Sequence, residues 1–148
     1  MAKVINPRGF RNNNPLNIRK GSQWKGLSSV QSDKSFCVFT SMRYGIRPAI
    51  YLLLKYYKKY NLHTLYDIIS RWAPKNENNT WNYCKLVALE LHIPVKYIPT
   101  LDLHLNEDTK LLYDLLNAMI YVENGRYLYI PSDEFYNILS TEIPSTLK

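Results

Sequence analysis

Apolar residues recur at helical spacing in five stretches of the chain, and turn-forming or capping residues bound each stretch. The pattern predicts helices at about 50–60, 64–74, 79–93 and 106–125, and a last short helix that Ser132 opens. Ahead of the first of these, Tyr44 to Pro48 is expected to form a turn or a short first helix, because proline is tolerated near a helix start. Thr64 is the expected N-cap of the second predicted helix.

The third predicted helix follows a polar loop and is expected to begin with Asn79 or Thr80 as its N-cap. Its apolar residues recur three to four positions apart and should form one buried face. The residues expected on that face are Trp81, Cys84, Ala88 and Leu91.

The fourth predicted helix has residues typical of helix caps at both ends. Asn106 is a good N-cap, and Glu107 and Asp108 would complement the positive end of the helix dipole in the first turn. Gly125 can adopt the left-handed conformation that ends a helix. The apolar stripe between these ends comprises Leu111, Leu112, Leu115, Leu116, Met119 and Ile120.

Glu123 lies four residues beyond Met119 and therefore continues this stripe at the C-terminal end of the helix. Partial burial and the negative end of the helix dipole both favour the neutral form of a carboxyl group. A glutamate that is protonated near neutral pH is what glycoside hydrolysis needs to protonate the leaving oxygen. The alternative is that Glu123 turns to the surface or pairs with Arg126.

The first 40 residues have no helical period. Residues 1–15 contain Pro7, Gly9 and three consecutive asparagines, which is typical of turns. Short apolar runs at 16–19, 24–27 and 34–40 predict a small β-meander or hairpin, with a strand at 36–40. The chain is therefore expected to be a single domain, 1–148, of α+β class and mainly helical.

Composition adds charge to this picture. The formal charge is +7, which predicts attraction to a polyanion such as nucleic acid, an anionic membrane surface or an acidic cell-wall polymer. No apolar run is long enough to span a membrane, and the N-terminus lacks the apolar core of a signal peptide. A target outside the cytoplasm would therefore require delivery by other machinery. The tyrosine-rich and lysine-rich run 55–60 also fits a nucleic-acid binder, but it is explained more simply as the solvated face of a helix.

Other chemistries have little support in the sequence. Cys37 and Cys84 are expected to be buried thiols, and the three histidines lack the spacing of metal ligands, so no metal and no cofactor is predicted. Glu77, in the polar loop before the third helix, should stay ionised and is the candidate for a second catalytic carboxylate. Its alternative role is to cap the following helix. Asp33 is expected to form an Asx-turn rather than to act in catalysis.

Several motifs have the order and spacing of a known family. They are RGFRNNNPLNIR at 8–19, WKG at 24–26, FCVFTS at 36–41, YGIR at 44–47, RWAP at 71–74 and ENNT at 77–80, followed by Tyr83. Together they resemble a family of small phage proteins and secreted toxins that are described as virion structural proteins or as lysozyme-like peptidoglycan hydrolases. In similar glucosaminidases and muramidases the catalytic glutamate ends a helix that precedes the first motifs. No acidic residue precedes Asp33 here, so the resemblance implies a lysozyme-like fold that is circularly rearranged, in which the Glu123 helix fills that place.

With this resemblance, the sequence predicts a muramidase or lytic transglycosylase that cleaves the glycan strand of peptidoglycan. Glu123 is the predicted general acid and Glu77 the second group. The predicted substrate-binding residues are Asn13, Asn14, Trp24, Tyr44 and Trp72. Packing or turn formation is the alternative role for each of these five. The expected partners are the peptidoglycan strand, a phage or secretion component that delivers the protein to the periplasm, and an immunity protein. The alternative function is a non-catalytic phage structural or wall-binding protein.

Overall fold

The computed structural model describes residues 6–73 and 79–148, and in these ranges the protein is built from helices joined by irregular segments. The helices, in chain order, are α1 (Arg8–Arg11), α2 (Met42–Lys58), α3 (Leu65–Trp72), α4 (Thr80–Glu90), the 3-10 helix η1 (Val95–Tyr97), α5 (Thr109–Asn124), α6 (Ser132–Thr141) and the 3-10 helix η2 (Ser145–Leu147). None of the described helices is long and apolar enough to cross a membrane.

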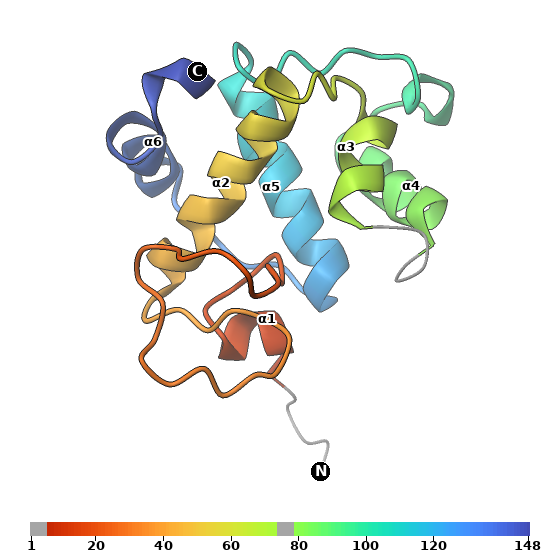
Figure 1. The fold of residues 1–148 in the computed structure, drawn as a ribbon. Helices are drawn as coiled ribbons and strands as arrows, with labels where there is room; N and C mark the ends of the chain where they lie inside the picture. The colour runs from red at the N-terminus through yellow and green to blue at the C-terminus, as the bar shows by residue number, and fades with distance from the viewer. Residues whose placement is uncertain (1–5, 74–78) are drawn as a thin grey trace.

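Helix α5 occupies the centre of the molecule (Figure 1). Helices α1 and α4 pack against it, α3 packs against α4, and α2 contacts α3, α6 and η2. The apolar stripe of α5 is buried as predicted from Leu112 to Ile120, whereas Leu111 is only partly buried. Figure 1 also shows that the N-terminal segment lies at one end of the molecule, beside the C-terminal end of α5.

Most helix boundaries agree with the capping signals in the sequence. The Thr64 side chain accepts a hydrogen bond from the Asp67 N–H, and the Asn79 side chain accepts one from the Asn82 N–H. Gly125 ends α5 in the left-handed conformation with φ of 71°. The predicted start of α5 is wrong, because Asp108 rather than Asn106 is the N-cap. Residues 105–107 form a turn closed by hydrogen bonds to the His104 carbonyl, so the helix begins at Thr109.

The prediction for the start of α2 is also wrong. The helix is continuous from Met42, where Ser41 accepts a hydrogen bond from the Tyr44 N–H, and Pro48 lies inside it. A proline in a helix interior removes one backbone hydrogen bond, here the bond to the carbonyl of residue 44. Pro48 is buried in the core, so apolar packing offsets the missing bond.

The buried face of α4 differs from the predicted one by a rotation about the helix axis. Trp81 is 39% exposed, whereas Tyr83 and Val87 are buried beside Cys84 and Ala88. These four residues recur three to four positions apart, as a buried helix face requires. Cys84 and Cys37 are both buried free thiols, as predicted.

The predicted β-meander is not formed. Residues 16–40 contain two isolated antiparallel bridges, Arg19 with Phe36 and Leu27 with Phe39, and no strand is present in the described part of the chain. The fold is therefore mainly helical rather than α+β.

Side-chain amides occupy part of the backbone hydrogen-bonding groups in this segment. The Asn14 amide donates to the Ile18 carbonyl and accepts from the Ile18 N–H, and the Gln31 amide does the same for Val38. Backbone pairing is present as well, because the Cys37 N–H donates to the Ile18 carbonyl and the Ser28 N–H donates to the Val38 carbonyl. The segment is therefore ordered by polar side chains together with the backbone hydrogen bonds around the two bridges.

Candidate active site

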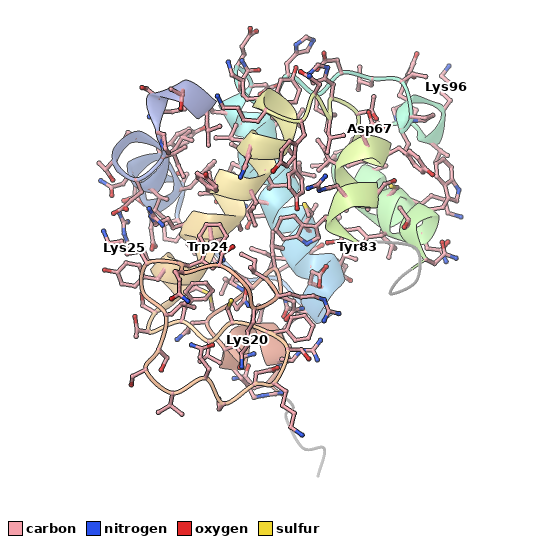
Figure 2. The ribbon with its side chains drawn as sticks, in the orientation of Figure 1. Lys20, Trp24, Lys25, Asp67, Tyr83 and Lys96 are labelled. Atoms are coloured by element: carbon pink, nitrogen blue, oxygen red, sulfur yellow. The ribbon has the colours of Figure 1, made fainter. Side chains whose placement is uncertain are left out.

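A pocket of about 600 Å³ lies where the N-terminal segment meets helices α2, α3, α4 and α5. Its walls combine aromatic rings, charged groups and aliphatic side chains. The lining residues are Arg8, Leu16, Asn17, Ile18, Arg19, Ser22, Trp24 and Phe36 from the N-terminal segment, and Leu52, Tyr56, Arg71, Trp72, Tyr83, Val122 and Glu123 from the helices. Figure 2 labels one residue from each group, Trp24 and Tyr83.

Glu123, in the last turn of α5, lies in this pocket and is half-buried. Its Oε1 accepts a hydrogen bond of 3.0 Å from the Asn17 side-chain amide. Its Oε2 accepts a hydrogen bond of 2.9 Å from the Tyr83 hydroxyl. A donor on each of the two oxygens fixes the plane of the carboxyl group, which is the kind of orientation that a catalytic group requires.

Contacts next to Glu123 hold the N-terminal segment against the end of α5. The Asn124 side-chain amide donates to the Pro15 carbonyl at 2.8 Å. A side chain at Gly9 would collide with Asn124, since a Cβ there would lie 2.4 Å from the Asn124 Oδ1. Asn17 adopts a left-handed backbone conformation with φ of 53°, which asparagine tolerates better than most residues. These contacts place Asn17 beside Glu123.

Tyr83 is a buried donor, with only 5% of its surface exposed. Burial, together with the negative charge of Glu123, raises the pKa of the Tyr83 hydroxyl well above its usual value. The hydroxyl therefore stays protonated at any physiological pH, and it can donate to Glu123 throughout that range.

Aromatic rings form much of the remaining wall. Trp24 meets Tyr51 edge to face with ring centroids 5.8 Å apart, and Tyr56 meets Trp72 at 6.0 Å. Aromatic faces of this kind stack on sugars and on nucleobases alike. The charged groups of the described lining are three arginines and Glu123, so the pocket has an excess of positive charge.

The structure brings three of the predicted site residues together, because Glu123, Trp24 and Trp72 all line the pocket. Asn13 and Asn14 lie outside its lining. The Asn14 side chain is fully buried and bonds to backbone groups, and the Asn13 amide donates to the Phe39 carbonyl, so both stabilise the segment.

Two other predicted residues also lie away from the pocket lining. Tyr44 packs against Gly26, where a Cβ would lie 2.1 Å from the Tyr44 ring. Asp33 forms the predicted Asx-turn, since its side chain accepts hydrogen bonds from the Ser35 and Phe36 N–H groups. These bonds lower the pKa of Asp33 to about 2. Glu77 lies outside the described residues.

Asn17 and Tyr83 are residues of the site that the sequence patterns did not predict. Tyr83 falls on the buried stripe of α4, and a buried tyrosine needs a partner for its hydroxyl, so the correct helix phase would have indicated it. Asn17 had no such signal, because its contact with Glu123 joins residues 106 positions apart.

Metal binding receives no support from the described residues, where no group of three or more histidine, cysteine, aspartate or glutamate side chains could hold an ion. The fold and the site instead define a small, mainly helical protein with one half-buried glutamate in an aromatic pocket.

No family model matches the sequence. The chain is 40% identical over 126 residues to Protein P5 of Pseudoalteromonas phage PM2, an alignment that covers 82% of this chain and 74% of the phage protein. The chain therefore belongs to the family of this phage protein.

Proposed function

We propose that this protein is a peptidoglycan glycosidase in which Glu123 acts as the general acid. The observation that carries the proposal is the placement of Glu123 in the wall of an aromatic pocket, with each carboxyl oxygen held by a separate donor. The pocket is large enough for sugar rings, since small-molecule sites range from about 300 to 1,000 Å³.

The proposed chemistry is the protonation of a glycosidic oxygen by Glu123 while the adjoining sugar develops positive charge. Asn17 and Tyr83 would keep the carboxyl group at a fixed angle to the bond. Trp24, Tyr56 and Trp72 would hold the sugar rings by stacking. The second step would use either water activated by another carboxylate, for which Glu77 is the candidate, or a nucleophile from the substrate itself, as in a lytic transglycosylase.

A non-catalytic wall-binding or virion protein is the second candidate. The hydrogen bonds at Glu123 fit this candidate too, because a carboxylate that only fixes a binding site would also be held at both oxygens. Such a protein would use the same pocket and walls without turnover.

The test is the release of soluble fragments from purified peptidoglycan by the wild type and by Glu123→Gln. Glu123→Gln is expected to reduce the rate of fragment release about 10²- to 10⁴-fold, which is the usual contribution of a general acid. Fragment masses would separate hydrolysis from transglycosylation, because the anhydro product is lighter by one water molecule.

Glu90→Gln is a matched control. Glu90 also accepts hydrogen bonds from a tyrosine hydroxyl, that of Tyr127, but it lies outside the pocket lining. Its variant should cleave at the wild-type rate. If the wild type binds peptidoglycan yet releases no fragments, the glycosidase proposal fails and the binding protein takes its place.

A further inference from the structure

One wall of the pocket carries two arginines on a single aromatic ring. The guanidinium carbon of Arg8 lies 4.0 Å from the centroid of the Phe36 ring, and that of Arg19 lies 4.7 Å from the same centroid. Both distances are within the range of cation–π contacts. Stacking on the ring limits the freedom of both side chains, so less entropy is lost when they bind a ligand.

This pair of cations lies in the same pocket as Glu123. The Asp33 carboxylate is close enough to Arg8 for the guanidinium to help lower the Asp33 pKa, but Asp33 is not part of the lining. Arg71 adds a third positive charge on the side of α3, and its guanidinium carbon lies 4.5 Å from the centroid of the Tyr60 ring. A neutral sugar needs no such charge, whereas a carboxylate is bound well by a planar guanidinium.

We infer that Arg8 and Arg19 recognise a carboxylate on the glycan strand, so that the pocket selects an acidic amino-sugar polymer over a neutral one. This inference rests on the proposed function, because it concerns the substrate of the same pocket. Peptidoglycan offers carboxylates of two kinds: those of its stem peptides, and the lactyl carboxylate of muramic acid, which is free only where the stem peptide has been removed, because the stem is joined to it as an amide. The two sources present the same chemistry to the arginines.

The test measures binding in the Glu123→Gln background, which avoids turnover, with the fluorescence of Trp24 and Trp72 as the signal. The probes are peptidoglycan strands freed of stem peptides, strands with stems intact, and each of these after its carboxylates have been converted to neutral amides. We expect the double variant Arg8→Gln/Arg19→Gln to bind the acidic strands about tenfold or more weakly and the neutralised strands unchanged. If the double variant binds stem-free strands more weakly, the lactyl group is the carboxylate that the arginines recognise. If it binds only the stem-bearing strands more weakly, the carboxylate belongs to the stem peptide.

Lys85→Gln is the control, because Lys85 is exposed on α4 and lies outside the pocket lining. It removes one positive charge outside the pocket, against two in the double variant, and should leave binding to every probe unchanged. An equal loss on acidic and neutralised strands would overturn the inference, since the arginines would then only shape the wall. Equally tight, arginine-dependent binding of a single-stranded oligonucleotide would overturn it as well.

The cleavage of peptidoglycan by the wild-type protein separates this inference from the proposed function. If the wild type cleaves peptidoglycan but Arg8→Gln/Arg19→Gln retains its preference for acidic strands, the carboxylate inference fails and the glycosidase stands. If Glu123→Gln and the wild type bind none of the strands, both fail.

Discussion

At the scale of single residues, the candidate site depends on a carboxyl group that two distant side chains hold. The helical period predicted that Glu123 continues the apolar stripe of α5, because its position relative to Met119 follows from local geometry alone. The same reasoning could not find Asn17, whose place beside Glu123 depends on how the N-terminal segment folds onto α5. Local sequence patterns thus identified the charged group, and the tertiary fold identified its donors.

Removal of the Tyr83 hydroxyl tests whether the orientation of Glu123 matters. Tyr83→Phe deletes one hydrogen bond to a carboxylate, and such bonds contribute about 1.5–3 kcal/mol. We expect the rate of peptidoglycan cleavage to fall by about tenfold or more while the protein remains folded. The measurement is the cleavage rate, set against the thermal unfolding temperature of the same sample.

Tyr127→Phe is the control for this substitution. It deletes the hydroxyl that bonds to Glu90, an exposed pair outside the pocket lining, and it should leave the rate unchanged. A Tyr83→Phe variant that cleaves peptidoglycan at the wild-type rate would show that the phenol is not needed to position Glu123.

At the scale of elements, the existence of α2 to α6 was predictable, although the starts of α2 and α5 were not, and the structure of the N-terminal segment was not predicted. The caps of α3 and α4 and the end of α5 depend on residues within one turn, so the sequence shows them directly. The segment from Asn12 to Thr40 is ordered by side chains that bond to backbone groups 4 to 26 positions away. Alternating apolar residues therefore indicated a strand at 36–40, where the structure has two isolated bridges and side-chain hydrogen bonds.

The contact between α2 and this segment can be tested at Gly45. In an isolated helix alanine is better than glycine by about 1 kcal/mol, so Gly45→Ala would normally stabilise α2. Here a Cβ would lie 1.7 Å from the Asn13 carbonyl oxygen, so the backbone must move. We expect a net destabilisation of about 1–3 kcal/mol, the usual range for overpacking, measured by urea unfolding.

Asn82→Ala provides the comparison, because Asn82 is an exposed position inside α4. There a somewhat smaller gain in helix propensity should appear without a clash, and stability should rise slightly or stay the same. If Gly45→Ala also stabilises the protein, the N-terminal segment does not press on α2 as described.

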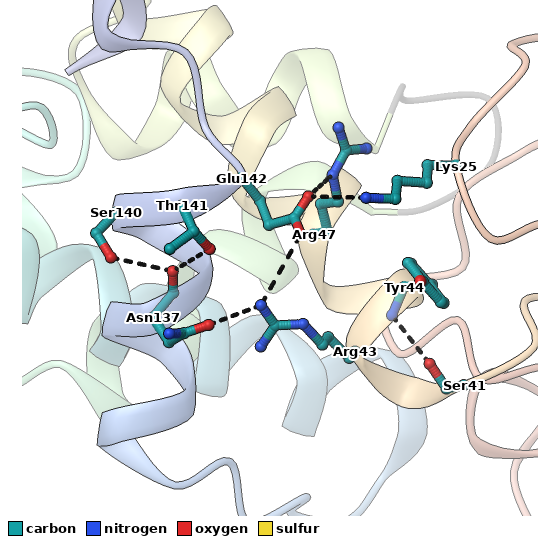
Figure 3. Close-up of polar contacts among 9 residues, drawn as sticks. All are labelled: Lys25, Ser41, Arg43, Tyr44, Arg47, Asn137, Ser140, Thr141 and Glu142. Atoms are coloured by element: carbon teal, nitrogen blue, oxygen red, sulfur yellow. Dashed lines mark hydrogen bonds and ion pairs between the residues drawn. The ribbon is translucent and has the colours of Figure 1, made fainter.

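At the scale of the whole molecule, one carboxylate joins three segments that are far apart in sequence. Glu142, at the end of α6, forms ion pairs with Arg47 at 2.9 Å, with Lys25 at 3.6 Å and with Arg43 at 4.0 Å (Figure 3). Arg43 also donates a hydrogen bond to the Asn137 side chain. The cluster connects the N-terminal segment and α2 to the C-terminal helices, on residues that do not line the pocket.

The pH dependence of stability tests whether this cluster holds the segments together. The hydrogen bond from Arg47, followed by the charges of Lys25, Arg47 and Arg43, lowers the pKa of Glu142 below its ordinary value of about 4.5. A group whose pKa is lower in the folded state stabilises the protein above the unfolded pKa and loses this effect as pH falls through the folded pKa. We therefore expect Glu142→Gln to reduce the free energy of unfolding most at pH 7, and the difference from the wild type to shrink below about pH 4.5.

Salt should reduce the same difference at pH 7, because ions screen partly exposed charges. Asp114→Asn breaks an exposed ion pair with Lys110 within α5 and should have a smaller effect, since that pair joins no distant segments. A difference between Glu142→Gln and the wild type that stays constant from pH 7 to pH 3 would show that Glu142 acts by packing rather than by charge. In that case the N-terminal wall of the pocket would depend on Asn124 and Gly9 at the end of α5 rather than on this cluster.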